Sequence, residues 1–367
     1  MKITKLSMAA AIAVSCISSA SAKDLTEAIK NVDVSGTVAY RYNDYEGSTP
    51  SNNYKIATTL KSKVNDDITA NTRIIIGDKT NPASLDTSTS DSEASFSLSE
   101  VNFAYTGIAN TTIIAGKQAL ATPFTISRDA MGNEQTGTGI VATTNAGPVS
   151  LTGGYFNQTN ANDGDTGLTI AGEDMYFVAA SVSLGGIVID SAYTDLDEQF
   201  DAYTLGLSAN YKVSGVSLSP YARYSALDLE SSDKDNSLWK VGMGANAGIF
   251  GAYLAYGQTN EEGGIVGIDG SSDTGMDDHW RVTLSNVADA SAIYASVNAQ
   301  VTEKINLALK YSDLDAGSLS ASKDQNEVYA QAVYQMSKNF MTFARLGQYE
   351  NDGQEYTSGR LHMQYAF

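Results

Sequence analysis

The final residues of the chain alternate strictly between two kinds of side chain. Every second position is apolar: Leu361, Met363, Tyr365 and Phe367. The positions between them are polar or small: Arg360, His362, Gln364 and Ala366. Because successive side chains of an extended strand point to opposite faces, this segment is predicted to be a strand with one apolar face. The same alternation recurs at 32–42, 68–76, 203–211, 305–311 and 328–336.

Two classes of connection separate these runs. Eight are short, at 64–67, 107–110, 145–148, 184–186, 212–215, 246–248, 302–304 and 337–339. Five are long, acidic and rich in Gly, Asn and Ser, at 78–94, 158–173, 228–236, 258–278 and 313–324. Strands of about 9–11 residues, joined by short turns that alternate with long loops, are typical of an outer-membrane β-barrel.

The predicted fold is therefore all-β, a transmembrane antiparallel β-barrel. Eight short turns imply nine hairpins, and hence about 18 strands within a range of 16–18. This number requires residues 278–290 to form a loop, although 279–284 alternate and would break the even number as a strand. A secreted β-solenoid or adhesin is the soluble alternative, but it requires a fixed short repeat that the sequence lacks.

The first 22 residues have the features of a secretory signal peptide. Lys2 and Lys5 precede a short apolar run at 8–17, and an Ala-x-Ala cleavage site follows at 20–22. Cys16, the only cysteine, lies inside this segment, where the preceding residues match a lipoprotein signal poorly. Residues 23–367 contain no proline- or serine-rich linker, so we expect one barrel domain after cleavage.

The charge and the histidines exclude several classes of function. The chain has 23 basic and 42 acidic residues; without Lys2 and Lys5 the balance is 21 against 42, or −21. Such a charge argues against nucleic acid as a partner. The only histidines are His279 and His362, and we find no serine or carboxylate pattern around them that indicates catalysis. We therefore expect no enzymatic activity.

The segment 25–44 resembles the start of the Campylobacter major outer membrane protein family. The resemblance lies in the pattern E-A-I-K-x-V-D-V-S-G-x-x-x-Y-R-Y. A terminal strand that ends on phenylalanine is similar to the assembly signal of outer-membrane barrels, which makes Phe367 the predicted signal here. The family resemblance implies an eighteen-stranded, trimeric, general-diffusion porin in the outer membrane that favours cations. Members are also described as calcium-binding.

Residues 117–139 are the predicted constriction loop. They form the third long connection, where porins fold a loop into the pore, and Gly-Lys-Gln followed by Thr-Pro-Phe resembles the entry to that loop. Four charged residues are the predicted constriction residues: Lys117, Arg128, Asp129 and Glu134. They would place both signs of charge in the channel. An ordinary outer loop is the alternative interpretation.

Inward-facing cations are predicted along the barrel wall. Charges on the lipid face cost up to about 2–4 kcal/mol near the bilayer midplane, so alternation directs them inward. The predicted wall residues are Arg41, Lys55, Lys61, Arg73, Arg223, Lys240, Arg345 and Arg360. Each could line the wall away from the narrowest point.

Acidic side chains dominate the long loops, and such residues at the outer mouth would concentrate cations. Five of them could supply oxygen ligands to calcium: Asp233, Asp235, Asp273, Asp277 and Asp278. Because no EF-hand spacing is present, solvated loops are the competing interpretation. No other cofactor is expected.

The expected function is passive diffusion of small hydrophilic solutes and ions, with mild cation selectivity. The expected partners are outer-membrane lipids and two further copies of the chain in a homotrimer. A surface adhesin or structural barrel is one alternative. A substrate-specific channel is another; it would show a line of aromatic residues or a dense basic ladder, and the sequence shows neither clearly.

Overall fold

The computed structural model describes residues 32–367 except 78–82, 88–93, 133, 162–171 and 233, so the signal-peptide prediction lies outside the described residues. The strands are β1 (Val32–Tyr45), β2 (Ser51–Lys63), β3 (Ile68–Ile76), β4 (Ala83–Ser84), β5 (Phe96–Ile108), β6 (Thr111–Ala119), β7 (Thr136–Ala146), β8 (Val149–Thr159), β9 (Met175–Leu184), β10 (Ile187–Leu196), β11 (Phe200–Ala209), β12 (Tyr211–Val213), β13 (Val216–Leu229), β14 (Asp235–Ala247), β15 (Phe250–Thr259), β16 (Ala290–Gln300), β17 (Ile305–Ala316), β18 (Gln325–Gln335), β19 (Phe340–Asn351) and β20 (Gln354–Ala366). No helix in the described part of the chain is long and apolar enough to cross a membrane.

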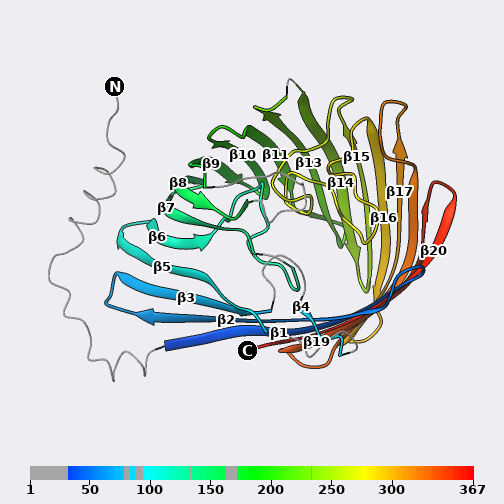
Figure 1. The fold of residues 1–367 in the computed structure, drawn as a ribbon, viewed down its shortest axis with the longest axis horizontal. Coiled ribbons are helices and arrows are strands. Elements are labelled where there is room, and N and C mark those ends of the chain that lie inside the picture. The colour runs from blue at the N-terminus through cyan, green and yellow to red at the C-terminus, as the bar shows by residue number, and fades with distance from the viewer. Residues whose placement is uncertain (1–31, 78–82, 88–93, 133, 162–171, 233) are drawn as a thin grey trace.

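These strands form one antiparallel sheet that closes on itself (Figure 1). Each strand pairs with its neighbours in sequence, and β1 pairs with both β2 and β20. The two-residue β4 pairs only with β2, and β11 and β12 are one strand interrupted at Asn210, since both pair with β13. The barrel therefore has 18 strands, as the turns predicted. A closed barrel leaves no backbone edge exposed to lipid.

The connections follow the sequence prediction on one side of the barrel. All eight predicted short turns join consecutive strands. In the turn between β9 and β10, Gly185 and Gly186 have φ of 57° and 90°. Two positive φ values fit the type I′ turn, which matches the twist of a hairpin. Residues 278–289 form a loop, as the even number of strands requires. On the other side, the connections at 197–199 and 352–353 are also short.

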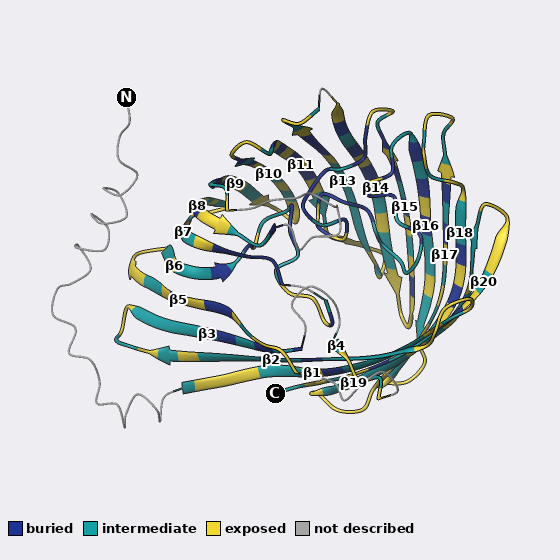
Figure 2. Ribbon diagram, viewed as in Figure 1, coloured by how far each residue is buried: buried dark blue, intermediate teal, exposed yellow. Residues whose placement is uncertain are grey.

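The two faces of the sheet differ in chemistry. Large apolar side chains are exposed on the outer face, including Val34, Leu205, Val241 and Leu254. Exposed and buried residues alternate along many strands in Figure 2. An apolar outer face suits a lipid environment, and it leaves polar side chains to point into the barrel.

The two ends of the barrel sequence meet between β1 and β20. Gly36 donates its backbone N–H to the carbonyl of Phe367 at 2.9 Å, and Phe367 returns the bond to Gly36 at 3.0 Å. A Cβ at Gly36 would lie 2.7 Å from the Phe367 ring and would also overlap the carbonyl oxygen of Ala57. Glycine at 36 thus makes room for the terminal phenylalanine. The role of Phe367 as an assembly signal stays a prediction.

Candidate functional site

Two connections fold into the barrel and meet there (Figure 1). We call residues 120–135, between β6 and β7, the constriction loop, and residues 260–289, between β15 and β16, the second inward loop. Ile268 donates its backbone N–H to the carbonyl of Phe124 at 2.8 Å, and Thr274 donates to Pro123 at 3.1 Å. The Gln135 side chain donates to Asp269 at 3.0 Å. The two loops therefore act as one layer that narrows the lumen.

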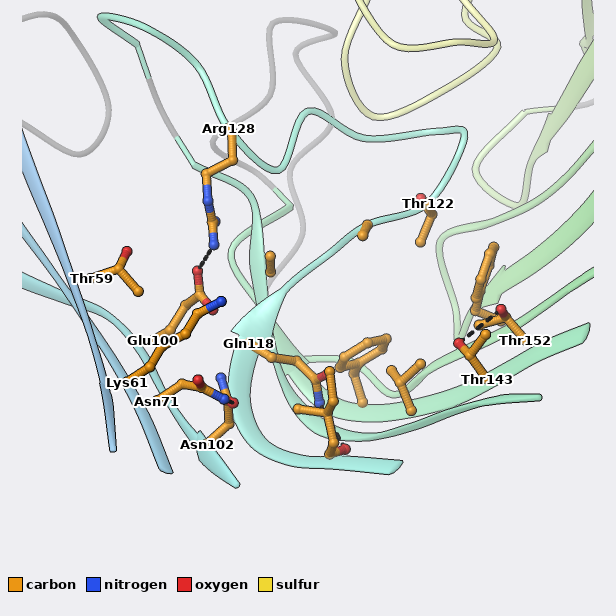
Figure 3. Close-up of a pocket in the computed structure, with 16 residues that line it drawn as sticks. Thr59, Lys61, Asn71, Glu100, Asn102, Gln118, Thr122, Arg128, Thr143 and Thr152 are labelled. Atoms are coloured by element: carbon orange, nitrogen blue, oxygen red, sulfur yellow. Dashed lines mark hydrogen bonds and ion pairs between the residues drawn. The ribbon is translucent and has the colours of Figure 1, made fainter. Parts of the chain in front are cut away.

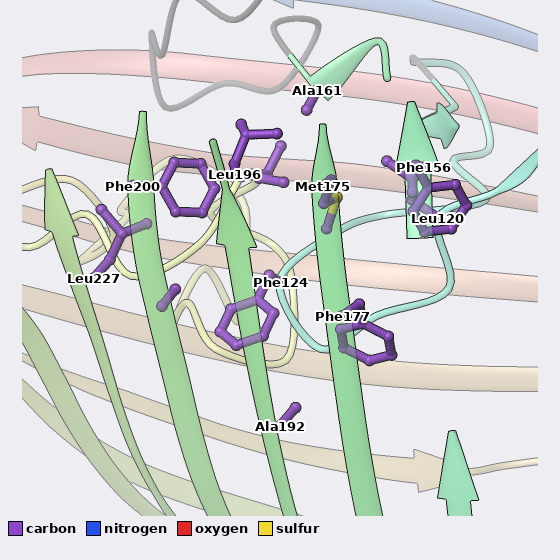
Figure 4. Packing of buried hydrophobic residues seen from close by; sticks show 12 residues of the cluster. Leu120, Phe124, Phe156, Ala161, Met175, Phe177, Ala192, Leu196, Phe200 and Leu227 are labelled. Atoms are coloured by element: carbon purple, nitrogen blue, oxygen red, sulfur yellow. The ribbon is translucent and has the colours of Figure 1, made fainter. Parts of the chain in front are cut away.

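Apolar contacts seat the constriction loop on the inner wall. Leu120 and Phe124 are fully buried against side chains of β8, β9 and β11 (Figure 4). The wall side chains of this cluster include Phe156, Met175 and Phe200. Burial of one large apolar side chain contributes about 1.5–3 kcal/mol. The inward-facing apolar side chains therefore form an apolar patch on this part of the inner wall, and the loop packs against it.

A buried carboxylate fixes the other side of the constriction loop. The side chain of Glu134 is 1% exposed and accepts hydrogen bonds from Arg73 at 2.7 Å and from Ser99 at 3.0 Å. Lys55 reaches the same carboxylate at 3.2 Å and also donates to the carbonyls of Asp129 and Gly132, both at 2.9 Å. Burial alone would raise the pKa of Glu134, but the hydrogen bond from Arg73 and the charges of Lys55 and Arg73 outweigh it. The pKa therefore lies below its usual value.

This geometry corrects the sequence interpretation of three residues. Glu134 was expected to face the channel, and Lys55 and Arg73 to line the wall. Lys55 and Arg73 point inward, but the loop covers them, and they are only 2% and 9% exposed. Glu134 points from the loop toward this wall and not into the channel. The three residues together hold the loop in place. Alternation predicts the direction of a side chain, but it carries no information about what lies on top of it.

Arg128 and Asp129 occupy the exposed tip of the constriction loop. Arg128 forms an ion pair with Glu100 of β5, and its own side chain is 44% exposed. The Asp129 carboxylate points toward its own loop. It accepts hydrogen bonds from the backbone N–H of Met131, at 2.7 Å, and from that of Gly132. Both signs of charge therefore stand at the tip, and their role in the constriction stays a prediction.

Lys117 does not belong to the constriction, contrary to the prediction. It lies on β6 directly opposite Val101, whose side chain is exposed on the outer face, and its Nζ donates to the carbonyl of Leu98 at 2.9 Å. The adjacent Gln118 points inward instead. The strand continues to Ala119, two residues beyond the predicted start of the loop, so the alternation still governs Lys117.

A cavity of about 380 Å³, lined by both polar and apolar side chains, lies beside the constriction loop (Figure 3). Its charged residues are Lys61 and the Arg128–Glu100 ion pair. Its neutral polar residues are Thr59, Asn71, Asn102, Gln118, Thr122, Thr143 and Thr152. Side chains that can both donate and accept hydrogen bonds suit water and uncharged solutes. Lys61 thus faces open space in the lumen.

The second inward loop has its own apolar core. Met276, Val282 and Leu284 are buried against wall residues such as Leu238 and Tyr294. The sequence interpretation placed 258–278 at the outer mouth because of its acidic residues. The structure contradicts this placement. Apolar side chains in the same stretch, such as Val266 and Met276, are buried inside the barrel. Lys240 donates to the carbonyl of Gly275 and is 8% exposed, so this predicted wall residue is also covered.

The far end of this loop crosses to the wall formed by β18–β20 and β1. Glu327 of β18 accepts the backbone N–H groups of Trp280 at 3.0 Å and Arg281 at 2.9 Å. The Arg281 guanidinium lies 4.5 Å from the ring centre of Tyr45 and 4.6 Å from that of Tyr349. The sequence alone did not indicate a role for three residues of this contact: Arg281, Trp280 and Glu327. The alternation at 279–284 was the available signal, but it indicated a strand.

His279 precedes Trp280 in the second inward loop. Its Nδ1 and the hydroxyl of Ser312 are 2.7 Å apart. Burial, followed by the positive charges of Lys310 and Arg345, lowers the pKa of His279 to about 3. The imidazole is therefore neutral at physiological pH and adds no charge to the lumen.

The remaining predicted wall residues differ in their partners. Arg223 forms an ion pair with Asp190 at 2.8 Å, which offsets its charge. Arg41, Arg345 and Arg360 lie on the adjacent strands β1, β19 and β20, partly exposed to the lumen. Arg345 is directly opposite Arg360 in the sheet. No carboxylate of the described residues lies within 4.0 Å of these three guanidinium groups, which we call the arginine cluster.

The predicted calcium ligands do not converge. Asp273, Asp277 and Asp278 lie on the second inward loop, Asp235 begins β14, and Asp233 lies outside the described residues. Asp278 accepts the hydroxyl of Tyr253, and Asp277 accepts that of Thr283. Within the ranges that the structure describes, no three His, Cys, Asp or Glu side chains are placed to hold a metal ion. The described residues therefore give the calcium expectation no support.

Comparison with known proteins gives a family and a fold. The family model described as "Campylobacter major outer membrane protein" matches residues 1–365. Among curated proteins, none matches the chain significantly. The chain resembles the structure of Pseudomonas aeruginosa OccK5 (OpdH), with a TM-score of 0.77, 11% identity, and coverage of 92% of this chain and 98% of that one.

Two further channels share the architecture. P. aeruginosa OccK1 (OpdK) has a TM-score of 0.77 at 10% identity, over 92% of this chain and 99% of that chain. Acinetobacter baumannii OccAB3 has a TM-score of 0.75 at 14% identity, with coverage of 92% and 99% respectively. At these identities the likeness concerns the fold.

Proposed function

Since the chain belongs to the Campylobacter major outer membrane protein family, and is thus an outer-membrane porin, we propose that it is a general-diffusion channel for small hydrophilic solutes and ions. The observation that carries this proposal is the cavity beside the constriction loop, which remains although two loops enter the lumen. Its mixed hydrogen-bonding side chains favour no single solute. The family and the fold are those of channel proteins.

We also propose mild cation selectivity. Residues 23–367 carry a net charge of −21, as 21 basic and 42 acidic residues give. Half of the predicted wall cations are withdrawn from the open lumen, because three are covered by the loops and Arg223 is paired with Asp190. The wall is therefore less basic than its sequence suggests. Arg41, Lys61, Arg345 and Arg360 still oppose cation passage, which keeps the selectivity modest.

Single-channel recording in a planar bilayer tests both parts. We expect stepwise, voltage-independent conductance and a reversal potential across a salt gradient that is displaced modestly toward the cation equilibrium potential. Uncharged solutes of increasing size should then be excluded by size alone. Absence of conductance would favour an adhesin or structural barrel, and exclusion that depends on solute chemistry would favour a substrate-specific channel. Either result contradicts the proposal.

A further inference from the structure

The cavity beside the constriction loop has two chemically different sides. Charged and amide side chains of β2, β3 and β5 form one side: Lys61, Asn71, Glu100 and Asn102. Apolar side chains of β6, β7, β8 and β9 form the other: Ile114, Val141, Phe156 and Phe177. Its volume of about 380 Å³ lies within the range of about 300–1,000 Å³ that is typical of small-molecule sites. The cavity can therefore hold a solute that has a charged end and an apolar end.

The register of the sheet gathers the polar side chains of this cavity. Lys61 lies opposite Asn71, and Asn71 lies opposite Asn102, so the three form one row across β2, β3 and β5. Glu100 is two residues from Asn102 on the same strand and therefore on the same face. Figure 3 shows these four side chains together on one side of the cavity. Because adjacent strands are about 4.7–4.9 Å apart, one small solute can contact several of them.

Two cations at the cavity keep donors for an anionic group. Lys61 forms no hydrogen bond or ion pair within the described residues, so its ammonium retains three N–H donors. Arg128 uses its two terminal nitrogens, one toward the carbonyl of Ser127 at 2.9 Å and one toward Glu100. A guanidinium has five N–H groups, so Arg128 also retains donors. A carboxylate of a solute can therefore bind between these two side chains.

The amide side chains of the cavity have their NH₂ groups engaged and their oxygens available. Asn102 donates to the carbonyl of Lys117 at 3.0 Å, and because a carbonyl only accepts, this bond fixes the orientation of the amide. Its oxygen accepts from Asn71 at 2.9 Å, which fixes Asn71 in turn. Gln118 likewise donates to the carbonyl of Ile114 at 3.2 Å. The oxygens of Asn71 and Gln118 have no hydrogen-bond partner among the described residues, and neither is fully buried.

Glu100 adds a negative charge beside these oxygens. One oxygen of its carboxylate accepts the Arg128 guanidinium. The other has no hydrogen-bond partner in the described part of the chain and is not fully buried. An ammonium group has three N–H donors, which suit the oxygens of Glu100, Asn71 and Gln118. The polar side of the cavity thus offers acceptors for an ammonium group and donors for a carboxylate.

We propose that this cavity is a binding subsite for zwitterionic α-amino acids that have an apolar side chain. The ammonium group binds at Glu100, the carboxylate binds at Lys61 and Arg128, and the side chain packs against Ile114 and Val141. This inference rests on the proposed function, because the solute reaches the cavity through an open pore. Such a subsite delays one class of solute near the constriction loop and leaves the passage of other solutes to their size.

The test is the effect of L-leucine on single-channel current in potassium chloride at pH 6. Leucine should reduce or interrupt the current saturably. Leucinamide, which is a cation at this pH because an α-amino group has a pKa of about 7.7–8.0, lacks the carboxylate and should bind roughly tenfold more weakly. N-acetylleucine lacks the ammonium group and should bind more weakly by a similar factor. Glycine lacks the apolar side chain and should also bind about tenfold more weakly.

Variants of Lys61 place the effect at this cavity. Lys61→Gln removes no hydrogen bond or ion pair of the described residues, so it should fold normally and bind leucine roughly tenfold more weakly. Lys61→Arg keeps the charge and should restore most of the binding. The matched control Arg345→Gln/Arg360→Gln removes two lumen cations elsewhere and should bind leucine like the unchanged protein.

Two kinds of failure are distinguishable. Equal binding of leucine by Lys61→Gln and by the unchanged protein overturns the subsite while the channel remains. Equal block by leucine and by leucinamide, N-acetylleucine or glycine also overturns it. Absence of any current in the unchanged protein overturns the proposed function itself, and the subsite with it.

Discussion

Two parts of the inner wall carry inward-facing cations and use them in opposite ways. On β2 and β3, Lys55 and Arg73 share the buried carboxylate of Glu134 and support the constriction loop. On β19, β20 and β1, the arginine cluster has only neutral partners and stays partly exposed. The sequence pattern is the same in both places. The difference shows that the position of a loop, and not the alternation of a strand, decides whether an inward cation is exposed to the lumen.

The largest expected effect comes from Glu134→Gln. The change leaves Arg73 and Lys55 buried without a counter-charge, and breaking a buried ion pair from one side costs about 3–5 kcal/mol. We expect the constriction loop to loosen, so that single-channel conductance rises and the thermal transition falls. Asp190→Asn is the matched control, because Asp190 and its partner Arg223 both belong to wall strands, β10 and β13. Unchanged conductance in the Glu134 variant would show that the loop is held by its apolar contacts alone.

A smaller effect is expected for Glu327→Gln at the other wall. Its carboxylate accepts the backbone N–H groups of Trp280 and Arg281, and hydrogen bonds to a charged group contribute about 1.5–3 kcal/mol. The second inward loop should then fluctuate more, which would appear as added noise in the open-channel current. Glu350→Gln, which removes a carboxylate bonded to Asn326 nearby, should leave the noise unchanged. Equal noise in both variants would refute the anchoring role.

Acid should reproduce part of the Glu134 effect in the unchanged protein. The pKa of Glu134 is lower in the folded chain than its usual value of 4.5. A depressed pKa contributes stability above the unfolded value, and this contribution is lost as pH falls through the folded value. Conductance should stay constant from pH 7 to about pH 5 and rise only at lower pH. A rise that begins above pH 5 would place the responsible group elsewhere.

The smallest effect is expected for Asp129→Asn. Its side chain lies at the exposed tip, where salt screens charges beyond about 8 Å at physiological ionic strength. Asparagine can still accept the backbone N–H groups of the loop, so only the charge changes. The reversal potential should move slightly toward anions at low salt and return at high salt. A shift that persists at high salt would mean that Asp129 lies at a narrower point than the structure indicates.

The sequence predicted the barrel because strands and turns are encoded locally. Alternation at 360–367, and turn residues such as Gly185 and Gly186, act within a few positions of the chain. The constriction needed information of longer range. Met276 and Leu284 bury an acidic loop in the lumen by packing in one cluster with the wall residues Tyr294 and Leu238. Such contacts between distant residues cannot be read from the local sequence. Lys117 was misplaced because the predicted loop began at residue 117, whereas β6 continues to Ala119.

Reagent access to introduced cysteines tests the central comparison most directly. Residues 23–367 contain no cysteine, so a single new thiol reports on its own position. Ala57→Cys lies on the face of β2 that carries Lys55 and is 0% exposed, whereas Gln364→Cys lies inward on β20 near the arginine cluster and is partly exposed. A charged thiol reagent should reduce the conductance of Gln364→Cys rapidly and leave that of Ala57→Cys unchanged. Equal reaction at the two sites would contradict the division of the wall into a covered and an open side.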